Sequence, residues 1–414
     1  MGANIRKNMT NFASDQQFIG MYNFDEVIER RGSSCLKYDA LEERYGRADL
    51  IPLWVADMDF KTPDFIVDAL RRRLDHPIFG YTMKGDYFSV LASWVEKLHG
   101  WSVKPEEMCY IPGIVKGIGL AQRCFLSPGD QVIIQPPVYH PFRLVPQACG
   151  FEVVNNPLIP VYDSEGFLQS YEMDFEGLER LIGPRTKMLV LSNPHNPCGI
   201  CFPKETLAQL AEICCRRGVI VVSDEIHAEM VLGGKRHIPF ASASEDAALC
   251  SISFMAPSKT FNIAGIVSSY CIIKNAELRD KFFNYLGACE LEDPTIFALE
   301  ATRAAYSEQG LAWREEMLAY VEGNIDFVCE WFAGNLPEIH PVRPQASFLV
   351  WLDCRKLALE QKDLVDLFVN KAGLALNDGA MFGPGGEGYM RLNIACPRSL
   401  LATALSQLKS AMGK

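Results

Sequence analysis

Three short apolar runs in the middle of the chain each lead into a polar residue, and this pattern limits the fold more than any other feature. The runs cover residues 188–191, 219–222 and 249–254, and they are followed by Asn196, Asp224 and Lys259. Short apolar runs bounded by turn residues are typical of buried strands. Parallel strands bring their carboxyl ends to one edge of a sheet. We therefore expect an amide, a carboxylate and an amine to meet at that edge.

A single lysine in a loop is usually solvated and charged. Lys259 can act as a nucleophile only if neighbouring residues bury its amine. Beside packed apolar residues, its amine would lose charge through desolvation and become a nucleophile. The three converging groups suit pyridoxal phosphate: Lys259 for the aldehyde, Asp224 for the ring nitrogen and Asn196 for the phenolic oxygen.

These motifs also resemble a known family. Asn-Pro-His-Asn-Pro-Cys-Gly (193–199), Ser-Asp-Glu-Ile-His (223–227) and Ser-Lys-Thr-Phe-Asn (258–262) look like fold-type I pyridoxal-phosphate enzymes. Pro-Leu-Trp-Val-Ala-Asp-Met-Asp-Phe (52–60) narrows the resemblance to the cystathionine β-lyase/C–S lyase branch, which is close to class I/II aminotransferases. The likeness runs from about Tyr22 to the C-terminal helix.

The alternation of strand-like and helical segments predicts an α/β chain with a mostly parallel sheet. The resemblance implies more: a three-layer α/β/α large domain with about seven strands, spanning residues 60–307. Residues 1–59 and 308–414 would then form an N-terminal arm and a smaller α+β domain.

The resemblance implies a set of site residues as well. Lys259, Asp224 and Tyr139 are expected to be catalytic, with Tyr139 stacked on the cofactor ring. Backbone N–H groups at a helix start bind phosphate well, and Gly113, Ile114 and Val115 match that cradle. The remaining expected contacts are Ser258 and His227 at the cofactor, Tyr81 reaching across a homodimer interface to the partner's phosphate, and Arg391, Asn196, Val55 and Ala56 on the substrate side.

Simpler explanations exist for several of these residues when each is taken alone. Tyr81 and Tyr139 would then be core aromatics with a polar tip, and Arg391 would be an exposed strand arginine in an ion pair. Lys116, which follows the predicted phosphate cradle, has no assigned role.

The chain departs from the aminotransferase pattern in two respects: the side chains expected near the cofactor phosphate, and the cation expected to bind a distal substrate carboxylate. Many aminotransferases have a phosphate-binding arginine eight residues after the lysine, where this chain has Val267. Ala256 also replaces a hydroxyl residue found in many relatives. Residues 282–297 hold no Lys or Arg but do hold Glu290, Glu292 and Asp293, which argues against dicarboxylic substrates.

The resemblance favours a C–S β-lyase that acts on cystathionine, cysteine or related amino acids and releases pyruvate, ammonia and a thiol. An aminotransferase uses the same first steps and is the main alternative. A regulatory protein that retains the cofactor is a third.

Composition limits the class of protein and the kinds of partner. The 414 residues are 49% hydrophobic and 22% charged, which is typical of a soluble globular protein with room for two domains. The net charge of −11 disfavours nucleic acid and anionic membranes as partners. No apolar run approaches the roughly 18–20 residues that span a bilayer. Residues 1–10 contain no signal-peptide core, so we expect a cytoplasmic protein.

Other motifs carry less weight. Cys198 and Cys201 have CxxC spacing, but no second pair with metal-ligand spacing accompanies them, and we expect no metal. The fourteen cysteines are expected to be reduced thiols. Residues 383–388 match G-x-G-x-x-G, yet a strand-like run follows where a dinucleotide site needs a helix.

Overall fold

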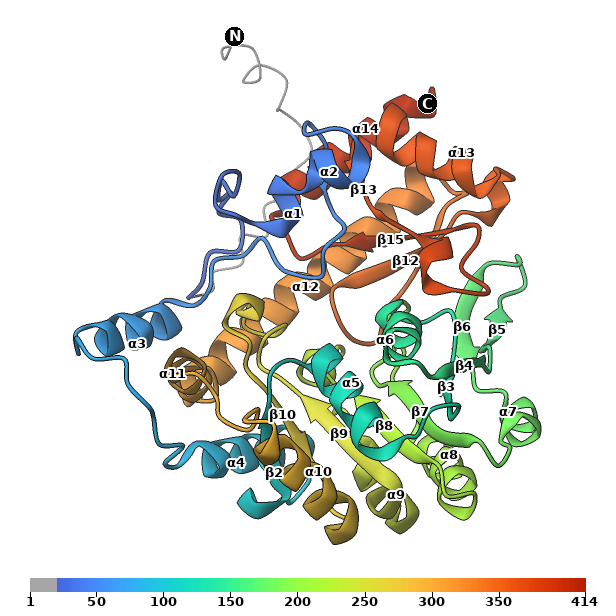
Figure 1. Cartoon of the computed structure of the whole chain (residues 1–414). Helices are drawn as coiled ribbons and strands as arrows, with labels where there is room; N and C mark the ends of the chain where they lie inside the picture. The colour runs from blue at the N-terminus through green and yellow to red at the C-terminus, as the bar shows by residue number, and fades with distance from the viewer. Residues whose placement is uncertain (1–20) are drawn as a thin grey trace.

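The computed structural model describes residues 21–414. Residues 1–20, which include the first part of the predicted arm and the segment tested for a signal peptide, lie outside this part. The described chain is built around a seven-stranded sheet (Figure 1). Its strands lie in the order β2 (Met108–Ile111), β10 (Ser269–Ile272), β9 (Ser251–Met255), β8 (Ile220–Asp224), β7 (Thr186–Ser192), β3 (Gln131–Ile134) and β4 (Glu152–Asn155).

The sheet is parallel except for one strand. Strand β10 pairs antiparallel with both β2 and β9, whereas the β9–β8, β8–β7, β7–β3 and β3–β4 pairs are parallel. The prediction of a mostly parallel sheet of about seven strands is confirmed. Because β10 runs in the opposite direction, its first residue, Ser269, lies at the edge where the parallel strands end.

Helices cover both faces of the sheet because the apolar runs bury both sides of each strand. In β7, Met188 and Val190 pack on one face with α5 (Ile114–Phe125), α6 (Pro141–Cys149) and α10 (Ala276–Ala288). Leu189 and Leu191 pack on the other face with α7 (Phe175–Leu181) and α8 (Lys204–Arg216). The large sheet is therefore the middle of three layers.

A second, antiparallel sheet has the order β11 (His340–Val342), β12 (Leu349–Asp353), β15 (Tyr389–Asn393) and β14 (Asn377–Asp378). A short parallel pair, β1 (Ile51–Pro52) with β13 (Leu374–Ala375), and a hairpin, β5 (Ile159–Tyr162) with β6 (Leu168–Glu172), complete the strands. The remaining helices are α1 (Leu36–Asp39), α2 (Leu41–Tyr45), α3 (Asp64–Leu74), α4 (Tyr87–His99), α9 (Glu245–Cys250), α11 (Ile296–Ala305), α12 (Glu308–Asn335), α13 (Gln361–Asp366) and α14 (Arg398–Ala411).

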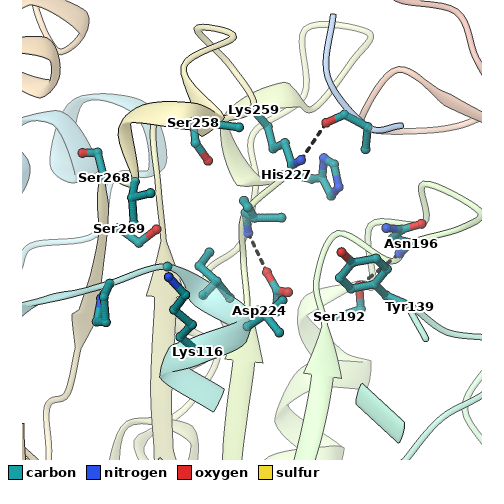
Figure 2. Close-up of a pocket in the computed structure, with 18 residues that line it drawn as sticks. Lys116, Tyr139, Ser192, Asn196, Asp224, His227, Ser258, Lys259, Ser268 and Ser269 are labelled. Atoms are coloured by element: carbon teal, nitrogen blue, oxygen red, sulfur yellow. Dashed lines mark hydrogen bonds between the residues drawn. The ribbon is translucent and has the colours of Figure 1, made fainter. Parts of the chain in front are cut away.

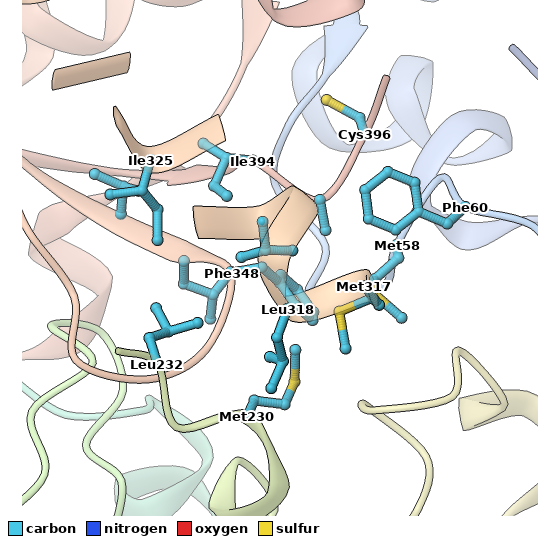
Figure 3. Close-up of a cluster of buried hydrophobic side chains, with 14 of the residues drawn as sticks. Met58, Phe60, Met230, Leu232, Met317, Leu318, Ile325, Phe348, Ile394 and Cys396 are labelled. Carbon is cyan, nitrogen blue, oxygen red and sulfur yellow. The ribbon is translucent and has the colours of Figure 1, made fainter. Parts of the chain in front are cut away.

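One apolar cluster joins the N-terminal segment to the second sheet (Figure 3). Met58 and Phe60 pack with Met317 of α12 and with Phe348 and Ile394 beside β12 and β15. Burying such side chains contributes roughly 1.5–3 kcal/mol each. The cluster holds the loop at residues 54–60 in place beside the large sheet. The division at residues 60 and 307 stays a prediction.

Two short helices in the N-terminal region follow each other directly: α1 and α2 meet at Ala40. Helix α4 begins at Tyr87. The G-x-G-x-x-G segment is followed directly by β15, as expected. Across residues 21–414, no helix is both long and apolar enough to span a membrane.

Candidate active site

A cavity of about 270 Å³ opens at the edge of the large sheet where β7, β8 and β9 end (Figure 2). Asn196, Asp224 and Lys259 all line it, each after one of the three strands identified from the sequence. Other predicted residues on its wall are Gly113, Ile114, Val115, Tyr139, His227, Ser258 and Ala56. The expected convergence of an amide, a carboxylate and an amine is present in the structure.

Asp224 is a buried carboxylate, and no cationic side chain among residues 21–414 lies within hydrogen-bonding range of it. The backbone N–H of Ile226 donates to its Oδ1 at 3.1 Å. Burial raises the pKa of Asp224 to about 7, because a carboxylate out of water loses hydration. A positively charged N–H group placed in the cavity would restore the charged form.

Lys259 points into the same cavity from the loop after β9. Its Nζ donates to the backbone carbonyl of Ala56 at 2.6 Å. Burial lowers the pKa of Lys259, although Asp57 and Asp224 oppose this. The amine is therefore closer to its neutral, nucleophilic form than an exposed lysine.

The N-terminus of α5 forms the wall beside β9 and β10. Gly113 is the residue before the helix and has a φ of 107°, a conformation that other residues rarely adopt. No side chain caps this helix start. Its first N–H groups are thus available to an anion, with the helix dipole in favour.

Tyr139 and His227 both lie on the cavity wall, where burial shifts the pKa of each side chain. Burial raises the pKa of Tyr139. Burial lowers the pKa of His227 to about 3, with Lys259 adding to the effect, so its ring is neutral near pH 7. The buried Nδ1 of His227 has no hydrogen-bond partner among residues 21–414.

Arg391 is buried and is not the exposed ion-pair residue of the simpler explanation. Its guanidinium donates to Asn196 Oδ1 at 2.9 Å, to Asn377 Oδ1 at 2.6 Å and to the Trp54 carbonyl at 3.0 Å. All three acceptors are neutral, and burial lowers the pKa of Arg391 to about 10. The buried Nε has no partner in the described chain. The charge of Arg391 is therefore left for an anion to neutralise.

Three predicted residues lie off the cavity wall: Arg391, Val55 and Tyr81. Val55 presents its carbonyl to Asn393 Nδ2 at 2.6 Å and supports the loop rather than lining the cavity. Tyr81 is fully exposed, which excludes its alternative placement in the core.

Several lining residues were not predicted from the sequence. Ser192 follows the apolar run of β7 directly, so the strand-end pattern could have indicated it. Ser268 and Ser269 lie at the start of β10, and no sequence signal showed that this strand is antiparallel. Lys116 and Val267 also line the cavity.

The donor set fits pyridoxal phosphate. A buried carboxylate that lacks a cation matches a ring N–H, an amine of lowered pKa matches an aldehyde, and an uncapped helix start matches a phosphate. Each group lines one cavity.

Comparison with known proteins also points to a pyridoxal-phosphate enzyme. Residues 48–408 match the model of the family described as aminotransferase class I and II. The chain is 41% identical over 392 residues to cystathionine beta-lyase PatB of Bacillus subtilis (strain 168), covering 94% of this chain and 100% of that protein.

Solved structures with the same fold contain the cofactor. Cystalysin from Treponema denticola, which contains pyridoxal 5'-phosphate, gives a TM-score of 0.89 at 31% identity, covering 95% of this chain and 99% of that one. The PLP-bound C–S lyase from Staphylococcus hominis gives a TM-score of 0.87 at 31% identity, covering 96% and 100%.

Proposed function

Because this chain belongs to the aminotransferase class I and II family, we propose that it is a pyridoxal-phosphate-dependent C–S β-lyase. The observation that carries the choice of reaction is its 41% identity, over the whole length of the relative, to a cystathionine beta-lyase. The substrate is a cystathionine- or cysteine-type amino acid, and the products are pyruvate, ammonia and a thiol.

When bound, pyridoxal phosphate supplies an electrophilic carbon for the substrate amine and a ring that withdraws electrons from the substrate α-carbon. Lys259 would hold the electrophilic carbon at rest. With substrate bound, the free Lys259 amine would take the proton from the substrate Cα. Its lowered pKa suits this role, because a base must be deprotonated to act.

Asp224 keeps a proton on the ring nitrogen, since its buried carboxylate gains the cation that it lacks. Asn196 donates to the phenolic oxygen from its amide nitrogen, because its Oδ1 already accepts from Arg391. Tyr139 covers the ring face. Each of these groups acts by binding or by holding a proton in place.

Arg391 binds the substrate α-carboxylate. The guanidinium is already fixed by Asn196, Asn377 and Trp54, so it orients the substrate without reorganisation. With the carboxylate held, Cα–H faces Lys259. The electron pair left at Cα would then form a Cα=Cβ bond as the Cβ–S bond breaks and the sulfur leaves as a thiolate. Water would convert the released enamine to pyruvate and ammonia.

Measuring pyruvate release from L-cystathionine without added 2-oxo acid tests the proposal. A β-lyase should release pyruvate and ammonia in equal amounts over many turnovers. A single turnover that becomes continuous only when a 2-oxo acid is added would instead identify an aminotransferase, the alternative that the family match favours. Cofactor binding without either reaction, together with a co-purifying protein partner, would support the regulatory alternative.

Replacing Arg391 with Lys should raise KM for the amino acid about 10- to 100-fold and change kcat less. Lysine keeps the charge but loses the planar pair of donors and leaves Asn196 or Asn377 unpaired. Steady-state kinetics at saturating cofactor measures this. Equal KM values for the variant and the wild type would show that another group binds the carboxylate.

We further propose that the protein works as a homodimer in which Tyr81 completes the partner's phosphate site. The segment around Tyr81 also exposes Ile78, Phe79 and Met83, an apolar surface that a second copy would cover. Light scattering should give about twice the 46.3 kDa chain mass.

An Ile78→Asp/Met83→Asp double variant should shift this mass toward one chain, since buried charges oppose association. Leu359→Asp, at an exposed leucine elsewhere, is the matched control. A wild-type protein that stays a single chain at working concentration contradicts the proposal.

A further inference from the structure

The cofactor phosphate is a dianion, and the cavity offers few positive charges to balance it. Among the lining residues of the described chain, the cationic side chains are Lys116 and Lys259, since the His227 ring is neutral near pH 7. Lys259 donates to the Ala56 carbonyl and is assigned to the aldehyde. Arg391 is outside the lining set and is held by three neutral acceptors. Lys116 is therefore the cation left for the phosphate.

Lys116 lies where a positive charge is electrostatically unfavourable, and a bound anion would remove this unfavourable interaction. It is the third residue of α5, in a first turn that contains no acidic residue. A cation at the positive end of a helix dipole is unfavourable. Within residues 21–414, its Nζ makes no ion pair closer than 4.0 Å, and its side chain is exposed. A phosphate at this helix start would be bound by the free N–H groups and by Lys116 together.

Of the hydroxyl groups that line the cavity, that of Ser269 lies on the same side as Lys116, where Ser268 Oγ is already hydrogen-bonded to Thr302 Oγ1. The hydroxyl groups of Ser192 and Tyr139 lie on the other side. Figure 2 shows Lys116, Ser268 and Ser269 on one side of Asp224, and Asn196 and Tyr139 on the other. One side of the cavity thus brings together an ammonium group, the Ser269 hydroxyl and helix N–H groups, all of which can donate to a phosphate. The other side carries the groups assigned to the ring and the substrate.

We propose that Lys116 is the side-chain cation that binds the phosphate of pyridoxal phosphate, an inference that rests on the proposed cofactor site. Lys116 acts with the N–H groups of α5, so the phosphate is bound by one side-chain ammonium group and by backbone N–H groups at the helix start.

Titrating the cofactor-free full-length protein with pyridoxal phosphate and with pyridoxal, which lacks the phosphate, tests the proposal by absorbance and fluorescence. Lys116→Met should weaken pyridoxal phosphate binding about 10- to 100-fold, the usual range for one charged hydrogen bond. Pyridoxal binding should change less than about twofold. Lys116→Arg should keep most of the phosphate-dependent affinity, because it keeps the charge.

Lys187→Met is the matched control, because Lys187 is exposed at the opposite end of β7 and its removal changes the net charge equally. An unchanged affinity of Lys116→Met for pyridoxal phosphate would overturn the proposal. If Lys116→Met bound pyridoxal phosphate and pyridoxal more weakly by the same factor, the proposal would also be overturned. That result would mean that Lys116 supports the structure of the cavity and does not bind the phosphate. These titrations do not depend on turnover, so a failure of the lyase assay leaves their outcome readable.

Discussion

Replacing Lys259 with alanine should abolish pyruvate release, with a loss of at least about 10⁴-fold, because the chain then lacks both its nucleophilic amine and its base. Its Nζ is the amine in hydrogen-bonding contact with the loop carbonyl of Ala56. The visible absorption of cofactor linked to lysine should disappear as well. The measurements are an absorption spectrum of the cofactor-loaded variant and a pyruvate assay.

The matched control for this change is Lys187→Ala, which removes an exposed lysine from the far end of β7. It should keep both the absorption and the activity. Partial recovery of Lys259→Ala activity by a small added alkyl amine would further assign the loss to the missing amine. A variant that kept the wild-type spectrum would rule out Lys259 as the attachment point.

Replacing Asp224 with asparagine should lower kcat about 10²- to 10³-fold, the usual loss when one preorganised electrostatic contact is removed. Asparagine keeps the shape of the side chain but cannot hold a proton on the ring nitrogen. Single-turnover kinetics at saturating cofactor would place the loss in the proton-abstraction step. A loss in cofactor affinity alone would contradict this role.

The same change should stabilise the cofactor-free protein at alkaline pH. Burial raises the pKa of Asp224 to about 7, whereas an unfolded chain has a value near 3.9. Between these values the folded state binds more protons than the unfolded state, so stability falls as pH rises from about 4 through 7. The wild type should then lose up to about 4 kcal/mol over this range, at 1.36 kcal/mol per pKa unit.

Urea unfolding at pH 5 and pH 8 measures this difference. The advantage of Asp224→Asn over the wild type should be larger at pH 8, since asparagine carries no charge. Asp75→Asn, at an exposed aspartate after α3, should show no such pH dependence. An equal advantage at both pH values would show that the Asp224 carboxylate is not the titrating group.

Much of the site follows from local sequence. Each of the runs that became β7, β8 and β9 is long enough for one buried strand, and the polar residue after it has little freedom to lie elsewhere. This is why Asn196, Asp224 and Lys259 could be placed together before any coordinates. The glycine at 113 likewise marks a strand-to-helix turn, since a φ of 107° there favours glycine.

Other parts depend on contacts between distant residues. The burial of Arg391 depends on Asn377 of β14 and on the Trp54 carbonyl from the loop at residues 54–60. That loop is itself held by Asn262, whose side chain bonds the backbone of Met58 and Phe60. Arg391 and Trp54 are 337 residues apart, and Asn262 and Met58 are 204 residues apart. Separations this long carry no periodic signal, so these contacts could not be read from the pattern of residues.

The sequence by itself determined the three strand ends, the mostly parallel sheet and the chemical types of the main cofactor-binding groups, because strand length and burial are local properties. Only the tertiary structure decided that β10 runs antiparallel and delivers Ser269 to the cavity. It also decided that Tyr81 is exposed and that Lys116 lies on the same side of the cavity as Ser268 and Ser269. These outcomes depend on how separate elements pack, and packing sums many weak contacts that no short stretch of sequence specifies.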